Sequence, residues 1–169
     1  FLIAALAYQE SRFQQNLTSR ANAKGIMQIK RSTARSKVVN IPNIDELEDN
    51  IHAGVKYLAF IRDHYFDKPE YSKEDQINFS LAAYNAGPGR IRKFQREAEK
   101  QGLNPYKWFY NVEALARQDI GHETVNYVSQ IQKRTIAIKA SLTLSKNKLR
   151  LKEQKLNEHK NKLSASQVQ

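Results

Sequence analysis

Residues that interrupt helices are scarce in this chain, and this scarcity restricts its fold more than any other feature. Six glycines and four prolines occur among 169 residues, and long stretches separate them. The clearest stretch carries Ile44, Leu47, Ile51, Val55 and Leu58 at spacings of three and four residues, which is the apolar stripe of a helix. We find no convincing strand pattern and no internal repeat. The sequence therefore predicts an all-α fold.

Helical patterns recur along most of the chain, and short breaks separate them. Gly87-Pro88-Gly89 ends one pattern, Gly102 ends another, and Pro42 precedes the helix described above. We expect further helices at residues 1–13, 32–34, 73–85 and 90–101, and from residue 122 onward. The last of these directs an apolar face toward a core, formed by Val125, Val128, Ile131, Thr135 and Ile138.

Length and composition restrict the class of protein. A chain of 169 residues suits a single domain with a sizeable core. The absence of cysteine excludes disulfides and thiolate metal sites. No apolar run approaches the ~18 residues that would cross a bilayer. Because Phe1 already lies in a helical pattern, without an initiator methionine or the basic segment of a signal peptide, we expect the numbering to begin within a longer protein.

The net charge of +11 is concentrated near the C-terminal end. From Lys139 onward the chain carries eight lysines and arginines and two acids, so more than half of the excess lies there. A basic surface suits anionic partners such as wall polymers, nucleic acid or membrane head groups, and composition does not choose among them. Nucleic acid is the least favoured partner, because the aromatic residues do not alternate with the basic ones.

The composition changes beyond Ser141, which indicates a domain at residues 1–140 followed by a basic, helical or disordered tail at residues 141–169. Leucine recurs every seven residues in this tail, at Leu142, Leu149, Leu156 and Leu163, as it does in a coiled coil. The second seam position that a coiled coil requires is mostly polar. We therefore favour an extended helix that is frayed or depends on a partner, and we expect residues 164–169 to be disordered.

Glu10 is the first residue that points to chemistry. If residues 1–13 are helical, Ile3, Leu6, Ala7 and Glu10 share one face, which puts a lone carboxylate where the pattern requires a core side chain. Desolvation would raise the pKa of that carboxyl group. A proton donor near neutral pH is what cleavage of a glycosidic bond requires. The alternative is a glutamate at a helix edge with its carboxylate in water.

Residues 25–29 place a thioether and an amide side by side after a glycine. Met27 suits an irregular apolar gap, and Gln28 offers a donor and an acceptor to a sugar or an acetamido group. Ordinary core packing is the alternative interpretation.

Two later segments combine apolar and polar residues in a similar way. In residues 82–89, Tyr84 and Asn85 stand at a helix end whose direction the glycine-rich turn determines; Asn85 could equally be a cap. In residues 122–128, Tyr127 lies one position from the apolar face, where a tyrosine is usually part of the core.

Taken together, these segments resemble the ordered motifs of the family 1 lytic transglycosylases, bacterial enzymes with an SLT domain and a goose-lysozyme-like, mainly helical fold. The resemblance covers about residues 1–138 and is carried by residues 10–11, 25–29 with 32–34, 83–89, and the pattern Glu123-Thr124-x-x-Tyr127-Val128. Many members have a proline where Lys30-Arg31 precede the serine here. This variant is most similar to the membrane-bound lytic transglycosylase F subgroup.

The resemblance implies catalytic roles for three residues. Glu10 matches the family's single acid, which protonates the oxygen between N-acetylmuramic acid and N-acetylglucosamine and then acts as a base on the muramyl C6 hydroxyl. Ser19 matches a serine that positions the reacting sugar, and Tyr127 a tyrosine that steadies the acid. Where some members have a second serine this chain has Ala21, so that contact is in doubt.

The resemblance also implies a set of substrate-binding residues. Gln28 and Asn85 match amides that bind the glycan, and Met27 and Tyr84 are expected to line the cleft. Ser11 is grouped with this site, more as a structural hydrogen-bonding residue than as a participant. No cofactor and no metal ion are implied.

The implied partners are peptidoglycan glycan strands in the periplasm or elsewhere in the cell envelope, with outer-membrane association left open. We expect a regulatory, solute-binding-like domain upstream and membrane association only through segments outside this chain, and no nucleic acid. Two alternatives remain at this point. One is a muramidase-type hydrolase on the same fold, which needs a second carboxylate if it inverts. The other is an inactive peptidoglycan-binding module.

Overall fold

A computed structural model describes the backbone of residues 1–166 and the side chains of residues 1–157. The predicted mainly helical fold is confirmed, with one very small sheet added to it. The elements in chain order are α1 (Leu2–Ser11), β1 (Ala23–Lys24), β2 (Ile29–Lys30), α2 (Arg31–Arg35), α3 (Leu47–Ile61), η1 (Arg62–Phe66), α4 (Lys73–Ala86), α5 (Pro88–Lys100), η2 (Trp108–Val112), α6 (Glu113–Ile120) and α7 (His122–Ser166).

Several helix ends differ from the predicted ones for local reasons. Helix α1 stops at Ser11 because Arg12 and Phe13 adopt left-handed backbone conformations, with φ of 53° and 65°. Helix α3 begins three residues after Ile44, yet Ile44 remains fully buried. The break between α4 and α5 is as expected, because Gly87 has a φ of 90° and Pro88 opens α5.

The small sheet is one of the elements that the sequence did not indicate. Strands β1 and β2 have two residues each and pair antiparallel, with Ala23 opposite Lys30 and Lys24 opposite Ile29. A tight turn joins them, in which Gly25 and Gln28 have φ of 76° and 46°. Strands this short carry no alternating pattern, so periodicity cannot reveal them.

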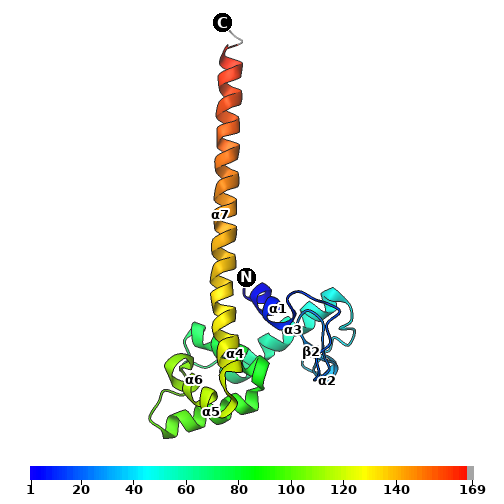
Figure 1. The fold of residues 1–169 in the computed structure, drawn as a ribbon, viewed down its shortest axis with the longest axis vertical. Helices are drawn as coiled ribbons and strands as arrows, with labels where there is room; N and C mark the ends of the chain where they lie inside the picture. Colours follow the sequence, from blue (N-terminus) through cyan, green and yellow to red (C-terminus); the bar gives the residue numbers. More distant parts are fainter. Residues whose placement is uncertain (167–169) are drawn as a thin grey trace.

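Two apolar cores support the fold. The larger one joins α1 and α4–α7 and includes the fully buried Leu6, Phe79 and Trp108. The smaller one lies around β2, α2 and the start of α3, and consists of Ile29, Ala34, Val39, Ile44 and Ala53. Tyr57 of α3 packs against both cores, so α3 connects the two parts of the molecule. Figure 1 shows the smaller part, with β2 and α2, to one side of the larger helical part.

The segment between α5 and α7 was not resolved into elements by the sequence pattern. Its aromatic residues form η2, an irregular turn in which Phe109 and Tyr110 leave helical geometry, and α6 follows directly. Trp108 is held there because its backbone N–H donates to Asp75 Oδ1 of α4 at 2.9 Å.

Helix α7 has two different halves. Val125, Val128 and Ile131 are buried against α1 and α4, and Ile138 is half-buried, as predicted. Beyond Ile138 the helix extends away from the other elements (Figure 1). Its backbone continues to Ser166, so the expected disorder at residues 164–166 is wrong, and residues 167–169 lie outside the described residues. Within residues 1–166, no helix is both long enough and apolar enough to cross a membrane.

Candidate active site

A cleft of about 530 Å³ opens where residues of the smaller part face α1, α4 and α7. Five of the residues predicted from sequence line it: Glu10, Ser19, Gln28, Tyr84 and Asn85. These residues come from segments far apart in the chain, and both apolar cores support the walls of the cleft. The tertiary structure therefore brings most of the predicted site residues together.

Glu10 and Tyr127 form a direct pair across α1 and α7. The Tyr127 hydroxyl donates a hydrogen bond to Glu10 Oε1. Burial raises the pKa of Glu10 from 4.5 to about 7, and the hydrogen bond from Tyr127 opposes that rise only in part. Burial and the adjacent carboxylate raise the pKa of Tyr127 well above its usual range, so this phenol stays a donor. Glu10 is thus poised to give or to take a proton near neutral pH.

Tyr84 closes the cleft beside Glu10. Its hydroxyl donates to the carbonyl oxygen of Met27 at 2.8 Å, which joins α4 to the turn between the two strands. Burial, followed by the charge of Glu10, raises the pKa of Tyr84 well above its usual range. Its ring also lies 5.5 Å from that of Tyr57, measured between centroids. Tyr84 therefore acts as a neutral wall that holds the turn in place.

The turn that carries Gln28 is held from behind by Asn50, a fully buried residue of α3. Its Oδ1 accepts from the N–H of Met27 at 2.9 Å, and its Nδ2 donates to the carbonyls of Lys24 and Ile44, each at 2.9 Å. A Cβ at Gly25 would lie 2.2 Å from that nitrogen, and the φ of Gly25 is positive as well. Only glycine fits this position.

Gln28, Ser19 and Asn85 lie on the cleft wall with part of their hydrogen-bonding capacity already used. The Gln28 amide nitrogen donates to the carbonyls of Gly25 at 2.9 Å and Leu17 at 3.2 Å. Ser19 Oγ accepts from a backbone N–H at 3.1 Å. Asn85 Oδ1 accepts from a threonine hydroxyl of α7 at 2.8 Å. These bonds fix the orientation of each side chain toward the cleft.

Besides Tyr127, which contacts Glu10 from the core side, two of the predicted residues do not line the cleft. Met27 is completely buried in the larger core, and its Cβ lies 2.6 Å from the position that a Cβ on Gly54 would take. The prediction that Met27 lines the cleft is therefore wrong. Ser11 is buried as well, and its hydroxyl donates to the carbonyl of Ile26 at 2.9 Å. Both residues support the turn that carries Gln28 rather than face the cavity.

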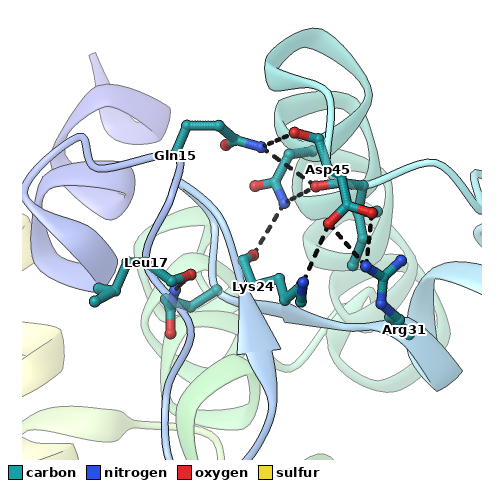
Figure 2. Close-up of polar contacts among 8 residues, drawn as sticks. Gln15, Leu17, Lys24, Arg31 and Asp45 are labelled. Atoms are coloured by element: carbon teal, nitrogen blue, oxygen red, sulfur yellow. Dashed lines mark hydrogen bonds and ion pairs between the residues drawn. The ribbon is translucent and has the colours of Figure 1, made fainter.

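A polar cluster on the smaller part holds the cleft wall from outside (Figure 2). Gln15 donates to the carbonyl of Asp45 at 2.9 Å and accepts from the N–H of Ile26 at 3.0 Å. The Asp45 carboxylate pairs with Arg31 at 2.6 Å and Lys24 at 3.3 Å, and these cations lower its pKa. Such exposed pairs add little stability. They instead tie the turn to the segment before α3.

A second tie between α1 and α7 lies one heptad beyond Tyr127. Arg134 donates a hydrogen bond to the Gln9 side chain, and its guanidinium stands 5.1 Å from the centroid of the Tyr8 ring. These contacts join the same two helices that carry Glu10 and Tyr127. They therefore add to the contacts that hold Glu10 and Tyr127 next to each other.

Nine cleft residues were not predicted to belong to the site, and four of them have polar or aromatic side chains: Lys30, Thr33, Tyr57 and Glu123. Thr33 and Glu123 lie in segments that carried the resemblance, which was a usable signal. Lys30 was noted only as a departure from the family pattern, and Tyr57 had no signal, because nothing local distinguishes it from a core residue. Within the described residues, no group of three or more histidine or acidic side chains is placed to hold a metal ion.

Comparison with known proteins agrees with this geometry. The family model described as Transglycosylase SLT domain matches residues 1–107. Proteins called membrane-bound lytic murein transglycosylase F are 40% identical in Pseudomonas fluorescens (strain Pf-5) and in Desulfosudis oleivorans, and 36% identical in Pseudomonas syringae pv. tomato, each over 107 residues. These alignments cover 63% of this chain and 21%, 23% and 21% of the relatives.

The chain thus spans about a fifth of the length of these relatives. The residues that the family model matches include Glu10, Ser19, Gln28 and Asn85 but end before α7, so the place of Tyr127 in the site rests on its contact with Glu10. Because the family model covers more than half of the residues, and the cleft gathers the side chains that its motifs supply, this chain belongs to the transglycosylase SLT domain family.

Proposed function

We propose that this chain is a peptidoglycan lytic transglycosylase that cleaves the β-1,4 bond between N-acetylmuramic acid and N-acetylglucosamine and leaves a 1,6-anhydro muramyl end. The observation that carries this proposal is the carboxyl group of Glu10, which lies in the cleft, accepts a hydrogen bond from Tyr127 and has a pKa of about 7. The family and the names of the relatives support the substrate class.

In the first step Glu10 acts as an acid. Its proton passes to the oxygen that links muramyl C1 to C4 of the next sugar, the C1–O bond breaks, and positive charge develops at C1 and the ring oxygen. The pKa of about 7 keeps much of Glu10 protonated near neutral pH, which a surface glutamate would not be. The carboxylate left behind is stabilised by the Tyr127 hydroxyl.

In the second step the same group acts as a base. The Glu10 carboxylate accepts the proton of the muramyl C6 hydroxyl while that oxygen bonds to C1, which closes the anhydro ring and restores the acid. No water is consumed and no second carboxylate is required. Gln28, Asn85 and Ser19 would hold the two sugars by their hydroxyl and acetamido groups, since all three side chains line the same cleft.

This activity places the chain at the cell envelope, because its substrate is there. We propose the periplasm as its compartment and glycan strands as its partner, in keeping with the membrane-bound relatives.

A hydrolase is the second candidate, and Glu123 is the observation that favours it. This exposed carboxylate also lines the cleft, so an inverting enzyme would have an acid in Glu10 and a candidate base in Glu123. Glu123→Gln would then abolish turnover, whereas a lytic transglycosylase would keep its product and most of its rate.

Digestion of purified sacculi, followed by mass spectrometry of the released glycans, tests the proposal. We expect anhydro-muramyl ends with the wild-type chain and none with Glu10→Gln, which keeps the shape and hydrogen bonding of the side chain but cannot supply the proton. Reducing muramyl ends would establish hydrolysis instead. Binding of sacculi without any new ends, in wild type and variant alike, would indicate an inactive binding module.

A further inference from the structure

The outer part of α7 contributes to neither core. Every side chain of residues 139–157, which we call the outer helix, is exposed. A single helix of this length is only marginally stable in water, and most helices gain their stability by packing an apolar face. The outer helix has apolar residues, but no other described element packs against them. Its five leucines expose between 46% and 61% of their surface, at positions 142, 144, 149, 151 and 156.

The leucines form two stripes. Leu142, Leu149 and Leu156 follow each other at seven residues, which is the repeat of a coiled-coil seam. Leu144 and Leu151 have the same spacing, two residues along, and two residues correspond to about 200° around a helix. The second stripe therefore lies almost opposite the first.

The outer helix is strongly basic. Six lysines and arginines stand against a single acid, Glu153. Residues next to the seam leucines in the heptad repeat include Lys146, Lys148 and Lys155, and Lys152 occupies the second seam position itself. These are the positions that meet the flanking charges of a partner helix.

We propose that the outer helix is a docking surface for an acidic, leucine-bearing helix of a partner protein, with which the stripe of Leu142, Leu149 and Leu156 forms a coiled coil. The leucines supply the buried apolar contact, and acids of the partner neutralise the lysines beside them. This inference does not depend on the activity proposed for the cleft.

Two other occupants fit less well. In a parallel pair, a second copy of this chain would bring Lys152 against Lys152 within the seam itself, and like charges at that position oppose pairing. A lipid surface contacts one side of a helix, in an apolar face flanked by cations. Here leucines lie on two nearly opposite sides and the basic residues fill the arcs between them, so no single side suits a bilayer.

Titration of the full chain with a labelled synthetic peptide tests the proposal. The probe has about four heptads, with leucine in the seam and glutamate at the flanking positions. Its control has glutamine in place of each glutamate. At about 150 mM salt we expect binding of the acidic peptide only. The variant L142Q/L149Q/L156Q should bind it at least about tenfold more weakly, because the apolar contact is lost while helix propensity and charge are kept.

The matched control is L144Q/L151Q, which removes leucines from the opposite stripe and should bind like the wild type. Equal affinity of the wild type and the triple variant would overturn the proposal, because attraction would then be due to charge alone. Loss of binding in L144Q/L151Q but not in the triple variant would overturn the choice of seam. Tighter binding to anionic vesicles or to duplex DNA than to the peptide, or dimerisation of the free chain in sedimentation, would also contradict it.

Discussion

At the residue scale, the energetics of the site centre on one carboxyl group that is held partly away from water. The pKa of Glu10 is raised from 4.5 to about 7, so between these values the folded chain holds a proton that the unfolded chain has released. The stability of the fold therefore decreases as pH rises through this window. Above this window Glu10 is ionised while it is buried, and this buried charge destabilises the folded chain.

Replacing Glu10 by glutamine removes this penalty. Below about pH 4.5 the variant and the wild type should differ little, because both side chains are neutral there. Above pH 7 the variant should be the more stable, by roughly 3 kcal/mol. Denaturant unfolding at the two pH values measures the difference. Glu99→Gln, which removes an exposed carboxylate from α5, controls for the loss of one charge; a gap independent of pH would contradict the assignment.

Tyr127→Phe tests the partner of the acid. The phenol lowers the pKa of Glu10 by donating to it, so its removal should move the alkaline decline in rate to higher pH. The rate at low pH should also decrease, by roughly ten- to a hundredfold, because the carboxylate formed in the first step loses its donor. A pH–rate profile on sacculi measures both effects. A decline at an unchanged pH would show that the two groups are not coupled during turnover.

At the element scale, the cleft wall depends on one side chain of α3. Asn50 joins the turn of residues 25–28 to the segment before α3 through three hydrogen bonds, and Gly25 packs directly against it. The cluster around Asp45 ties the same turn from its exposed side, with weaker effect because its groups lie in water.

Asn50→Ala should therefore lower the free energy of unfolding by about 2–4 kcal/mol, because it leaves buried backbone groups unpaired. It should also raise KM more than it lowers kcat, since the turn carries Gln28 while Glu10 lies on another helix. Denaturant unfolding and kinetics on sacculi measure these effects. Asn126→Ala removes an exposed amide from α7 and is the control; equal losses in both variants would refute this role.

At the scale of the whole molecule, we expect the helical domain to fold without the outer helix. Truncation after Ala140 should change Tm by less than about 5 °C and leave the released glycans unchanged, because the described side chains beyond it are exposed. Truncation after Asn126, which removes Val128 and Ile131 from the core, should prevent folding. Thermal unfolding and product analysis measure both. A large loss of stability in the first truncation would show that the outer helix belongs to the domain.

The sequence by itself determined the helical fold and five of the residues that line the cleft, Glu10 among them. Apolar spacing and the breaks at Gly87 and Gly102 are local properties, so α3, α4, α5 and the start of α7 could be predicted. The same locality explains the errors. The strands are too short to show a period, and an isolated residue such as Tyr57 has no local signal of its place in the cleft.

Only the tertiary structure decided which of those residues face the cavity and how Glu10 ionises. Met27 and Gln28 are neighbours in sequence, yet the turn held by Asn50 buries the first and presents the second. Glu10 meets Tyr127 from 117 residues away. Desolvation and hydrogen bonding depend on every group within a few ångströms, whatever its place in the chain, so a pKa of about 7 is a property of the packed helices and not of the motif around Glu10.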